Sequence, residues 1–179
     1  MNVKFLNPFV EAATEVLQAE VGVSPARGNL TLHKSALTTD EVTVLISLVG
    51  QVQGVVLYGL SVATGLALVS RMMSQDFAEF DSLAQSGVAE LGNVITGQAS
   101  IKLAGAGAAA DISPPTLILG RGVTISTLDF SRIVVPLACD LGQITVHLAL
   151  RESPSDGRGL SAVPLLANVG LAAAGRSAP

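Results

Sequence analysis

An acidic residue and a carboxamide stand three residues apart in the segment DSLAQSGVAELGNVITGQASIKLAG, which spans residues 81–105. The amide of Asn93 carries an acceptor oxygen and two donor hydrogens, so it can orient a water molecule. Glu90 offers a fixed anion that can bind a lysine or arginine of a partner. Phosphoryl hydrolysis needs an in-line water and electrostatic support. The pair can position the water and supply part of the electrostatic support. Two polar residues at this spacing are also typical of an ordinary solvated helix face.

The segment that carries this pair has the signals of a long helix. Asp81 or Ser82 can cap its first turn. At about 100° per residue, one face collects apolar residues, with Val94 at its margin. That apolar face is Ala84, Val88, Leu91 and Ile95, and a second, small and polar face is Ser86, Glu90, Asn93 and Gly97. The glycine on the polar face leaves room for another surface to come close.

The composition indicates one globular domain with an aliphatic core. The chain has 179 residues, of which 49% are hydrophobic, 13% charged and 3% aromatic. A net charge of −4 gives no electrostatic reason to expect nucleic acid as a partner. The scarcity of aromatic residues also removes the stacking platforms that bind single strands.

Several features favour a cytoplasmic protein without a membrane segment. The single cysteine, Cys139, excludes an internal disulfide framework and fits a reducing compartment. The opening MNVKFLNPFVEAA lacks the pattern of a signal peptide. No charge occurs between Glu41 and Arg71, but glycines and polar residues interrupt that stretch. It therefore predicts strand, turn, strand and helix in place of a membrane span.

The remaining periodicities predict an α+β fold of two layers. Asn7 as cap and Pro8 at the first helical position predict a helix that ends near Gly22. Ser61 predicts the cap of a second helix, which runs through Met73. The apolar row of that helix is Leu66, Val69 and Met73. Residues 104–111 prolong the long helix or form a loop. Strands are predicted at 30–37, 41–49, 55–60, 116–119, 123–128, 133–139 and 143–150, with a hairpin loop at 50–54. Short links favour an antiparallel-rich sheet with the long helices packed on one face.

The C-terminal residues differ in character from the rest. We expect a domain over residues 1–152 and a polar linker with an Ala/Leu-rich tail over residues 153–179. The tail is interpreted as a segment that packs on its own domain or is poorly ordered, or as a docking peptide.

The residues so far described resemble a known family of proteins. Ser86, Glu90 and Asn93, followed by the prolines 114–115, match the motif of the CheC/CheX/FliY family of chemotaxis phosphatases. The opening MNVKFLNPFVEAATEVL and the segment DISPPT look most like the CheX branch. The likeness covers residues 1 to about 152. The proline lies one residue closer than usual if Pro115 is the relevant one.

The resemblance implies an enzyme, a phosphatase that hydrolyses the aspartyl phosphate of a CheY-like receiver domain of a response regulator. Asn93 would orient the attacking water, Glu90 would pair with a receiver lysine, and Ser86, with Gly97, would lie on the docking face. The partner would bring Mg²⁺, and the chain would need no cofactor of its own. CheX-like members form dimers through their sheets, so we expect a homodimer. The alternative is a CheX-like scaffold that docks a receiver or another signalling protein without catalysis. A third hypothesis, a structural part related to flagellar switch proteins, rests on analogy alone.

Other constellations are weaker. CheC carries a second Glu-x-x-Asn in its first helix, whereas this chain has Glu11-x-x-Thr14 and Glu15-x-x-Gln18 there, so we expect no second site. His33 and His147 lie on predicted strands without further ligands at metal-binding spacing. Cys139 is interpreted as a small buried hydrophobe rather than a nucleophile. The chain lacks the Gly-x-Ser-x-Gly of a serine hydrolase, and the Gly-Arg-Gly at 120–122 is a turn.

Overall fold

The structure, a computed structural model, describes residues 3–34, 37–126 and 131–153. Its helical elements are the 3₁₀ turn η1 Val3–Phe5, α1 Leu6–Val16, the π-helical turn η2 Leu17–Val21, α2 Val62–Met73 and α3 Ser82–Gly105. Its strands are β1 Ala26–Arg27, β2 Thr31–His33, β3 Leu37–Thr38, β4 Val42–Gly50, β5 Val52–Leu60, β6 Ala110–Ile112, β7 Thr116–Leu119, β8 Thr124–Ile125, β9 Arg132–Cys139 and β10 Gly142–Glu152. No helix within these ranges is long and apolar enough to span a membrane.

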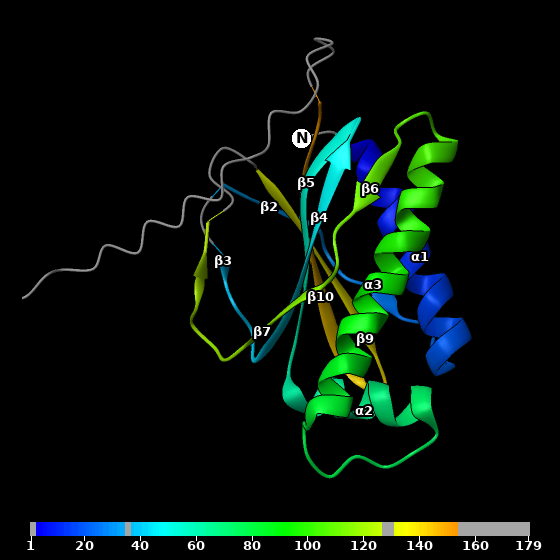
Figure 1. Cartoon of the computed structure of the whole chain (residues 1–179), viewed down its shortest axis with the longest axis vertical. Helices are drawn as coiled ribbons and strands as arrows, with labels where there is room; N and C mark the ends of the chain where they lie inside the picture. The colour runs from blue at the N-terminus through cyan, green and yellow to red at the C-terminus, as the bar shows by residue number, and fades with distance from the viewer. Residues whose placement is uncertain (1–2, 35–36, 127–130, 154–179) are drawn as a thin grey trace, which may run out of the picture.

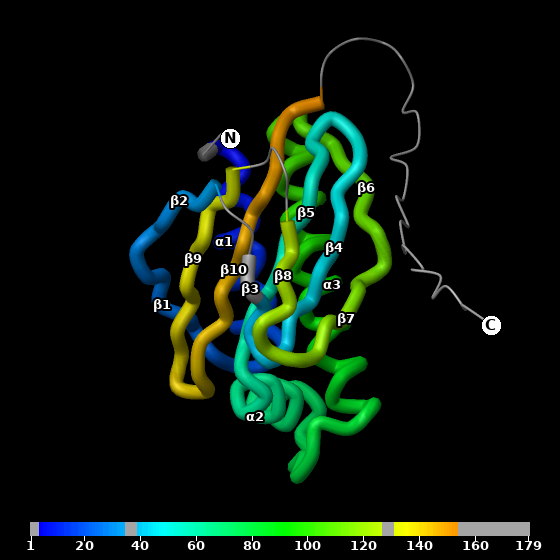
Figure 2. The backbone as a smooth tube through the Cα atoms, turned by 90° about the vertical axis from the view of Figure 1, so that its left-hand side faces the viewer, coloured from blue at the N-terminus to red at the C-terminus, as the bar shows by residue number. Residues whose placement is uncertain are grey.

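The strands form one large antiparallel sheet with the helices on one of its faces. The path runs β1-β9-β10-β5-β4-β6, with β2 also paired to β9 and β7 also paired to β4. Every described pairing is antiparallel. Figure 1 shows the sheet on edge with α1 and α3 along one side and α2 at one end. Figure 2 shows its other face, over which the small β3–β8 pair lies. The predicted two-layer α+β fold is therefore confirmed.

The core lies between the sheet and the helices. Alternate residues of the central strands face α1 and α3, and they pack against the buried stripes of those helices. The strand side of this core includes Val42, Val44, Ile46 and Leu48 of β4 and Ile144, Val146, Leu148 and Leu150 of β10. Because these side chains are aliphatic and close-packed, they hold α3 at a defined height above the sheet.

The long helix α3 has the bounds and the buried face that its sequence predicts. Asp81 caps it, because its Oδ1 accepts a hydrogen bond from the backbone N–H of Ala84 at 2.8 Å. The four predicted apolar residues, Ala84, Val88, Leu91 and Ile95, are all buried. Gly92 is buried beside them, where a Cβ atom would stand 3.0 Å from Val44 Cγ1 and 3.3 Å from Tyr58 Cδ2. This glycine allows α3 to approach the sheet closely.

Two glycines of α3 provide a matched test of that close approach. We expect Gly92→Val to lower the free energy of unfolding by about 2 kcal/mol, because the added atoms must displace Val44 and Tyr58 in a packed core. Gly97→Ala should instead raise it by about 0.5–1 kcal/mol, since alanine has the higher helix propensity. Its Cβ would meet only Ile112 Cδ1, at 3.9 Å. Urea unfolding of both variants measures this, and equal effects at the two sites would contradict the packing argument.

The first helix begins differently from its prediction. Asn7 is not its cap, because α1 starts at Leu6 and the preceding Phe5 provides no side-chain capping bond. The 3₁₀ turn η1 leads directly into the helix, so Asn7 and Pro8 both lie within its first turn. The predicted end is confirmed: the helical path continues through the π-helical turn η2 to Gly22, which adopts a left-handed φ of 75°.

The hairpin predicted at residues 50–54 joins β4 to β5, but most of its predicted loop is strand. The β4–β5 ladder does end with the pair Leu48 and Gly54. Both strands nevertheless continue, because β4 extends beside β6 and β5 extends beside β10. Only Gln51 separates the two strands. Outer neighbours that are distant in sequence therefore convert an expected loop into strand.

Smaller differences occur elsewhere. In place of a strand at 30–37 the structure has the short β2 and β3, and β8 covers only part of 123–128. Parts of both predictions, residues 35–36 and 127–130, lie outside the described residues, as do residues 154–179 of the tail. The second helix has its predicted bounds and its Ser61 cap, but its buried side chains are those of Thr64, Leu68 and Val69 rather than Leu66 and Met73. Residues 104–111 divide between the end of α3 and β6.

Candidate functional site

The Glu-x-x-Asn pair lies on the outer side of α3, facing away from the sheet. Glu90 is exposed and Asn93 is half-buried. The Nδ2 of Asn93 donates a hydrogen bond to Glu90 Oε2 at 3.3 Å. A carboxylate can only accept, so this bond assigns the nitrogen of the amide to the Glu90 side. The amide oxygen does not take part in this bond, so its acceptor capacity is not used by Glu90.

The other two predicted site residues share this outer face. The exposed Ser86 donates its hydroxyl hydrogen to the carbonyl of Ser82 at 2.8 Å, which leaves its oxygen as an acceptor. Gly97 is half-buried on the side of α3 nearest to Ile112 of β6. Positions 86, 90, 93 and 97 follow one another at three- and four-residue steps along one regular helix, so the structure brings all four residues together on one face.

A buried hydrogen bond fixes the turn of α3 that carries the site. Tyr58 Oη on β5 lies 2.8 Å from Thr96 Oγ1. Thr96 donates its own hydrogen to the carbonyl of Gly92 at 2.8 Å, so the tyrosine must be the donor to Thr96. Burial raises the pKa of Tyr58, which keeps this donor protonated. This bond joins the helix to the sheet within one turn of Asn93.

Sequence reasoning missed Tyr58 and Thr96 as residues that position the site. A signal was present, because Tyr58 is the only tyrosine of the chain and Thr96 interrupts an apolar helix face. Partners 38 residues apart cannot be matched from periodicity alone.

The proline segment lies at the sheet edge next to α3. Ser113, at its start, donates its backbone N–H to Ser47 O at 2.9 Å and accepts from Ser47 N at 3.0 Å through its hydroxyl. Ser100 of α3 donates to the carbonyl of Ala110 on β6 at 2.5 Å. The exposed Pro114 and half-buried Pro115 therefore occupy a fixed position between β6 and β7, beside α3 rather than beneath it.

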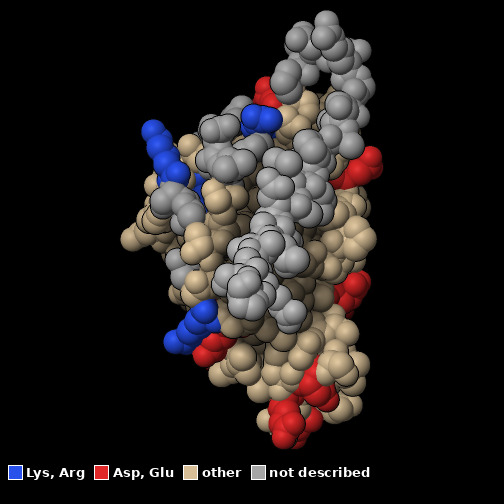
Figure 3. Space-filling view, turned by 60° about the vertical axis from the view of Figure 1, so that its left-hand side comes forward, with Lys and Arg blue, Asp and Glu red and all other residues tan. Residues whose placement is uncertain are grey.

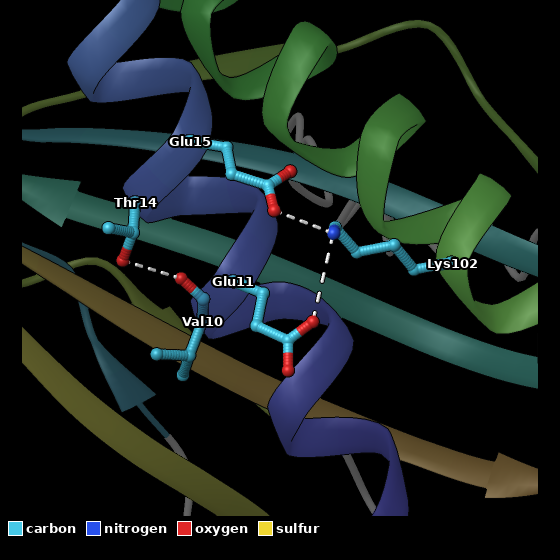
Figure 4. Close-up of polar contacts among 5 residues, drawn as sticks. All are labelled: Val10, Glu11, Thr14, Glu15 and Lys102. Carbon is cyan, nitrogen blue, oxygen red and sulfur yellow. Dashed lines mark hydrogen bonds and ion pairs between the residues drawn. The ribbon is translucent and has the colours of Figure 1, made fainter.

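In α1, the residues at the positions of a second Glu-x-x-Asn motif bond to other residues of this chain. Figure 4 shows Lys102 of α3 between two carboxylates of α1, with its Nζ 2.8 Å from Glu15 and 3.7 Å from Glu11. The hydrogen bond to Glu15 and the charges of both carboxylates raise the pKa of Lys102. Thr14 donates to the carbonyl of Val10 at 2.9 Å. These carboxylates hold α1 against α3, and the carboxamide of Gln18, three residues after Glu15, accepts a hydrogen bond from the hydroxyl of Ser24.

Charge is unevenly distributed around the site. Figure 3 shows acidic side chains gathered at the end of the molecule where α2 and α3 meet. The connection between these helices carries Asp76, Glu79 and the capping Asp81. The field at the start of α3 therefore favours a partner with positive charge.

The two histidines lie apart from this face. His33 is exposed on β2 and shares a hydrogen bond of 3.0 Å with Thr31, whereas His147 is buried on β10. Among residues 3–34, 37–126 and 131–153, no group of three His, Cys, Asp or Glu side chains is placed to hold a metal ion. Cys139 is half-buried and forms no disulfide.

His147 is expected to make stability depend on pH. Burial, with the positive charges of Arg132 and His33, lowers its pKa to about 4. Above the unfolded pKa of about 6.5 the imidazole is neutral in both states, so it adds no pH dependence there. As the pH falls from 6.5 to 4, only the unfolded state gains the proton, and stability should fall by at most about 3 kcal/mol.

Denaturant unfolding between pH 4 and 7 measures this effect. The variant His147→Leu should flatten the pH dependence in this window, whereas the exposed-site variant His33→Gln should retain most of it. An unchanged slope in His147→Leu would show that other groups cause the pH dependence.

The fold and the exposed face of α3 define a CheC-like α+β protein. A CheC-like superfamily protein from Shewanella sp. PV-4 superimposes with a TM-score of 0.77 and 27% identity, over 84% of this chain and 99% of that chain. A chain of the CheX–CheY–BeF₃–Mg²⁺ complex from Borrelia burgdorferi superimposes with a TM-score of 0.71 and 28% identity, over 84% of this chain and 100% of that chain.

Sequence comparison identifies the family. The CheY-P phosphatase CheX of Thermotoga maritima is 29% identical over 128 residues, which cover 71% of this chain and 83% of the relative. The profile of the family described as chemotaxis phosphatase CheX matches residues 42–138. The chain belongs to this family. The matched region contains all four predicted site residues and the proline segment.

Proposed function

We propose that this chain hydrolyses the aspartyl phosphate of a CheY-type receiver domain. The observation that carries the proposal is the pair of the exposed Glu90 and the half-buried Asn93, joined by a hydrogen bond of 3.3 Å on the outer face of α3. The family supports it, since the relative from Thermotoga maritima is named a CheY-P phosphatase. A helix anchored by its own core presents the pair rigidly, as a site completed by a partner requires.

The proposed mechanism uses the amide to direct water. The oxygen of Asn93 accepts a hydrogen from a water molecule and points its lone pair at phosphorus. The water oxygen then bonds to phosphorus, the bond to the aspartyl oxygen breaks, and the products are inorganic phosphate and a free carboxylate on the receiver. Glu90 pairs with a receiver lysine and sets the register of docking.

The metal would come from the partner. The Borrelia burgdorferi complex contains CheY with BeF₃ and Mg²⁺, which fits a receiver that brings its own cation. Ser86 and Gly97 would contact the receiver on the same face. Ser86 would do so through its acceptor oxygen, and Gly97 through helix backbone that no side chain covers. The proposed substrate implies a cytoplasmic location.

The measurement that tests this function is the lifetime of the phosphoryl group on receivers from the same organism. Catalytic amounts of the chain should shorten that lifetime for at least one receiver, with release of inorganic phosphate. A module that docks without catalysis would bind the receiver and leave the lifetime unchanged. Unchanged lifetimes across all receivers would refute the phosphatase proposal.

We also propose a homodimer formed through the sheets, as the CheX resemblance implies. The strands β1 and β2 lie at one edge of the sheet and β6 and β7 at the other, and an unpaired edge invites pairing with a second chain. Light scattering across a concentration series should give twice the monomer mass of 18.2 kDa. A constant mass of one chain would contradict it.

A further inference from the structure

The outer face of α3 carries two exposed, large apolar side chains in addition to the polar pair. Leu83 near the start of the helix is 47% exposed, and Ile101 near its end is 66% exposed. Leu83 lies seven residues before Glu90, and Ile101 lies eleven residues after it. Seven residues are close to two full turns and eleven are close to three, so both side chains stand on the side of the helix that carries Glu90.

Charge on this face is restricted to a single group. Between Ser82 and Ile101, Glu90 is the only charged residue of the helix. Helix surfaces that face only solvent usually carry several charged residues. A lone carboxylate between apolar side chains instead has the arrangement of a binding hot spot, in which apolar contacts exclude water from one central ion pair. Excluding water strengthens that pair by lowering the local dielectric constant.

We propose that Leu83 and Ile101 are docking anchors that contact a receiver domain on either side of the phosphorylated site. This inference rests on the proposed function for the identity of the partner. The rise of the helix places Leu83 about 10 Å and Ile101 about 16 Å from Glu90 along the axis. A face of this length suits the footprint of one small domain. The complementary surface is a lysine flanked by two apolar patches.

Within residues 3–34, 37–126 and 131–153, Leu83 and Ile101 remain among the exposed large hydrophobic side chains. Figure 1 shows α3 beside the sheet, which is seen on edge, with no labelled element drawn over the helix. The helix α3 contacts α1, α2, β4, β6 and β7. Its inner face is filled by the buried residues from Ala84 to Leu103. The core therefore does not require Leu83 or Ile101 to be apolar.

The test is the dissociation constant for a CheY-type receiver loaded with Mg²⁺ and beryllium fluoride, measured by calorimetry. Leu83→Ser and Ile101→Ser should each weaken binding about 3- to 10-fold, and the double variant more than either. The salt dependence of binding should persist in these variants, because the Glu90 ion pair remains. A control is Val123→Ser, which changes a 45% exposed valine just before β8, outside the strands and outside α3. This control should bind as the unmodified chain does.

Binding within twofold of the unmodified chain for both variants, or an equal loss in Val123→Ser, would overturn the inference. Because the experiment measures binding, it distinguishes a failure of the proposed anchors from a failure of the proposed phosphatase activity. Normal phosphate release with unaffected binding in both variants refutes the anchors alone. Weakened binding in the variants with no phosphate release by the unmodified chain supports the anchors and refutes the phosphatase. Thermal unfolding confirms that each variant is folded.

Discussion

Asn93→Ala should reduce the rate of phosphate release from a saturating phosphorylated receiver by about 100-fold or more. The variant loses the amide oxygen that holds the water in line, while the carboxylate of Glu90 remains to dock the partner. Binding of a beryllium fluoride-loaded receiver should therefore change by less than about threefold, since the ion pair is intact. Single-turnover decay of the phosphoreceiver and calorimetric titration measure the two quantities separately.

The matched control for this prediction is Gln98→Ala. Gln98 is another exposed carboxamide on α3, five residues further along and off the face that carries the pair. Its removal should leave the rate unchanged. Hydrolysis at the normal rate in Asn93→Ala would show that the amide does not orient the water.

Glu90→Ala should weaken binding of the loaded receiver by about 10- to 100-fold, because the receiver lysine loses its carboxylate at the centre of the contact. The loss should be greatest at low salt, and the remaining affinity should depend less on ionic strength. Turnover at saturation should fall as well, because the Asn93 amide loses the acceptor 3.3 Å away that holds it.

The variant Glu90→Gln separates these two roles of the carboxylate. Its amide oxygen can still accept from Asn93 Nδ2, so turnover at saturation should recover more than affinity does. Glu20→Ala is the control, because it removes an exposed carboxylate of η2 that lies outside α3 and outside the acidic connection before it. An unchanged dissociation constant in Glu90→Ala would rule out the lysine pairing.

The sequence anticipated the helix of the candidate site more accurately than the sheet beneath it. The bounds and buried face of α3 followed from a cap and a 3.6-residue period, both of which are local in the chain. The strand β7 was predicted with its observed bounds for a similar reason, since turn residues delimit it. The loop of the hairpin at residues 50–54 was predicted too long because β6 and β10, which extend the two strands, come from far along the chain.

The amino-acid sequence alone determined which chemistry α3 carries: Glu90 and Asn93 lie on one helical face because three residues make nearly one turn. Only the tertiary structure decided that this face points away from the sheet. The Tyr58–Thr96 bond and the contact of Gly92 with Val44 direct the opposite side of the helix inward. Likewise, only the fold placed Lys102 between Glu11 and Glu15. Such contacts join residues that are distant in sequence, and packing rather than local periodicity selects them.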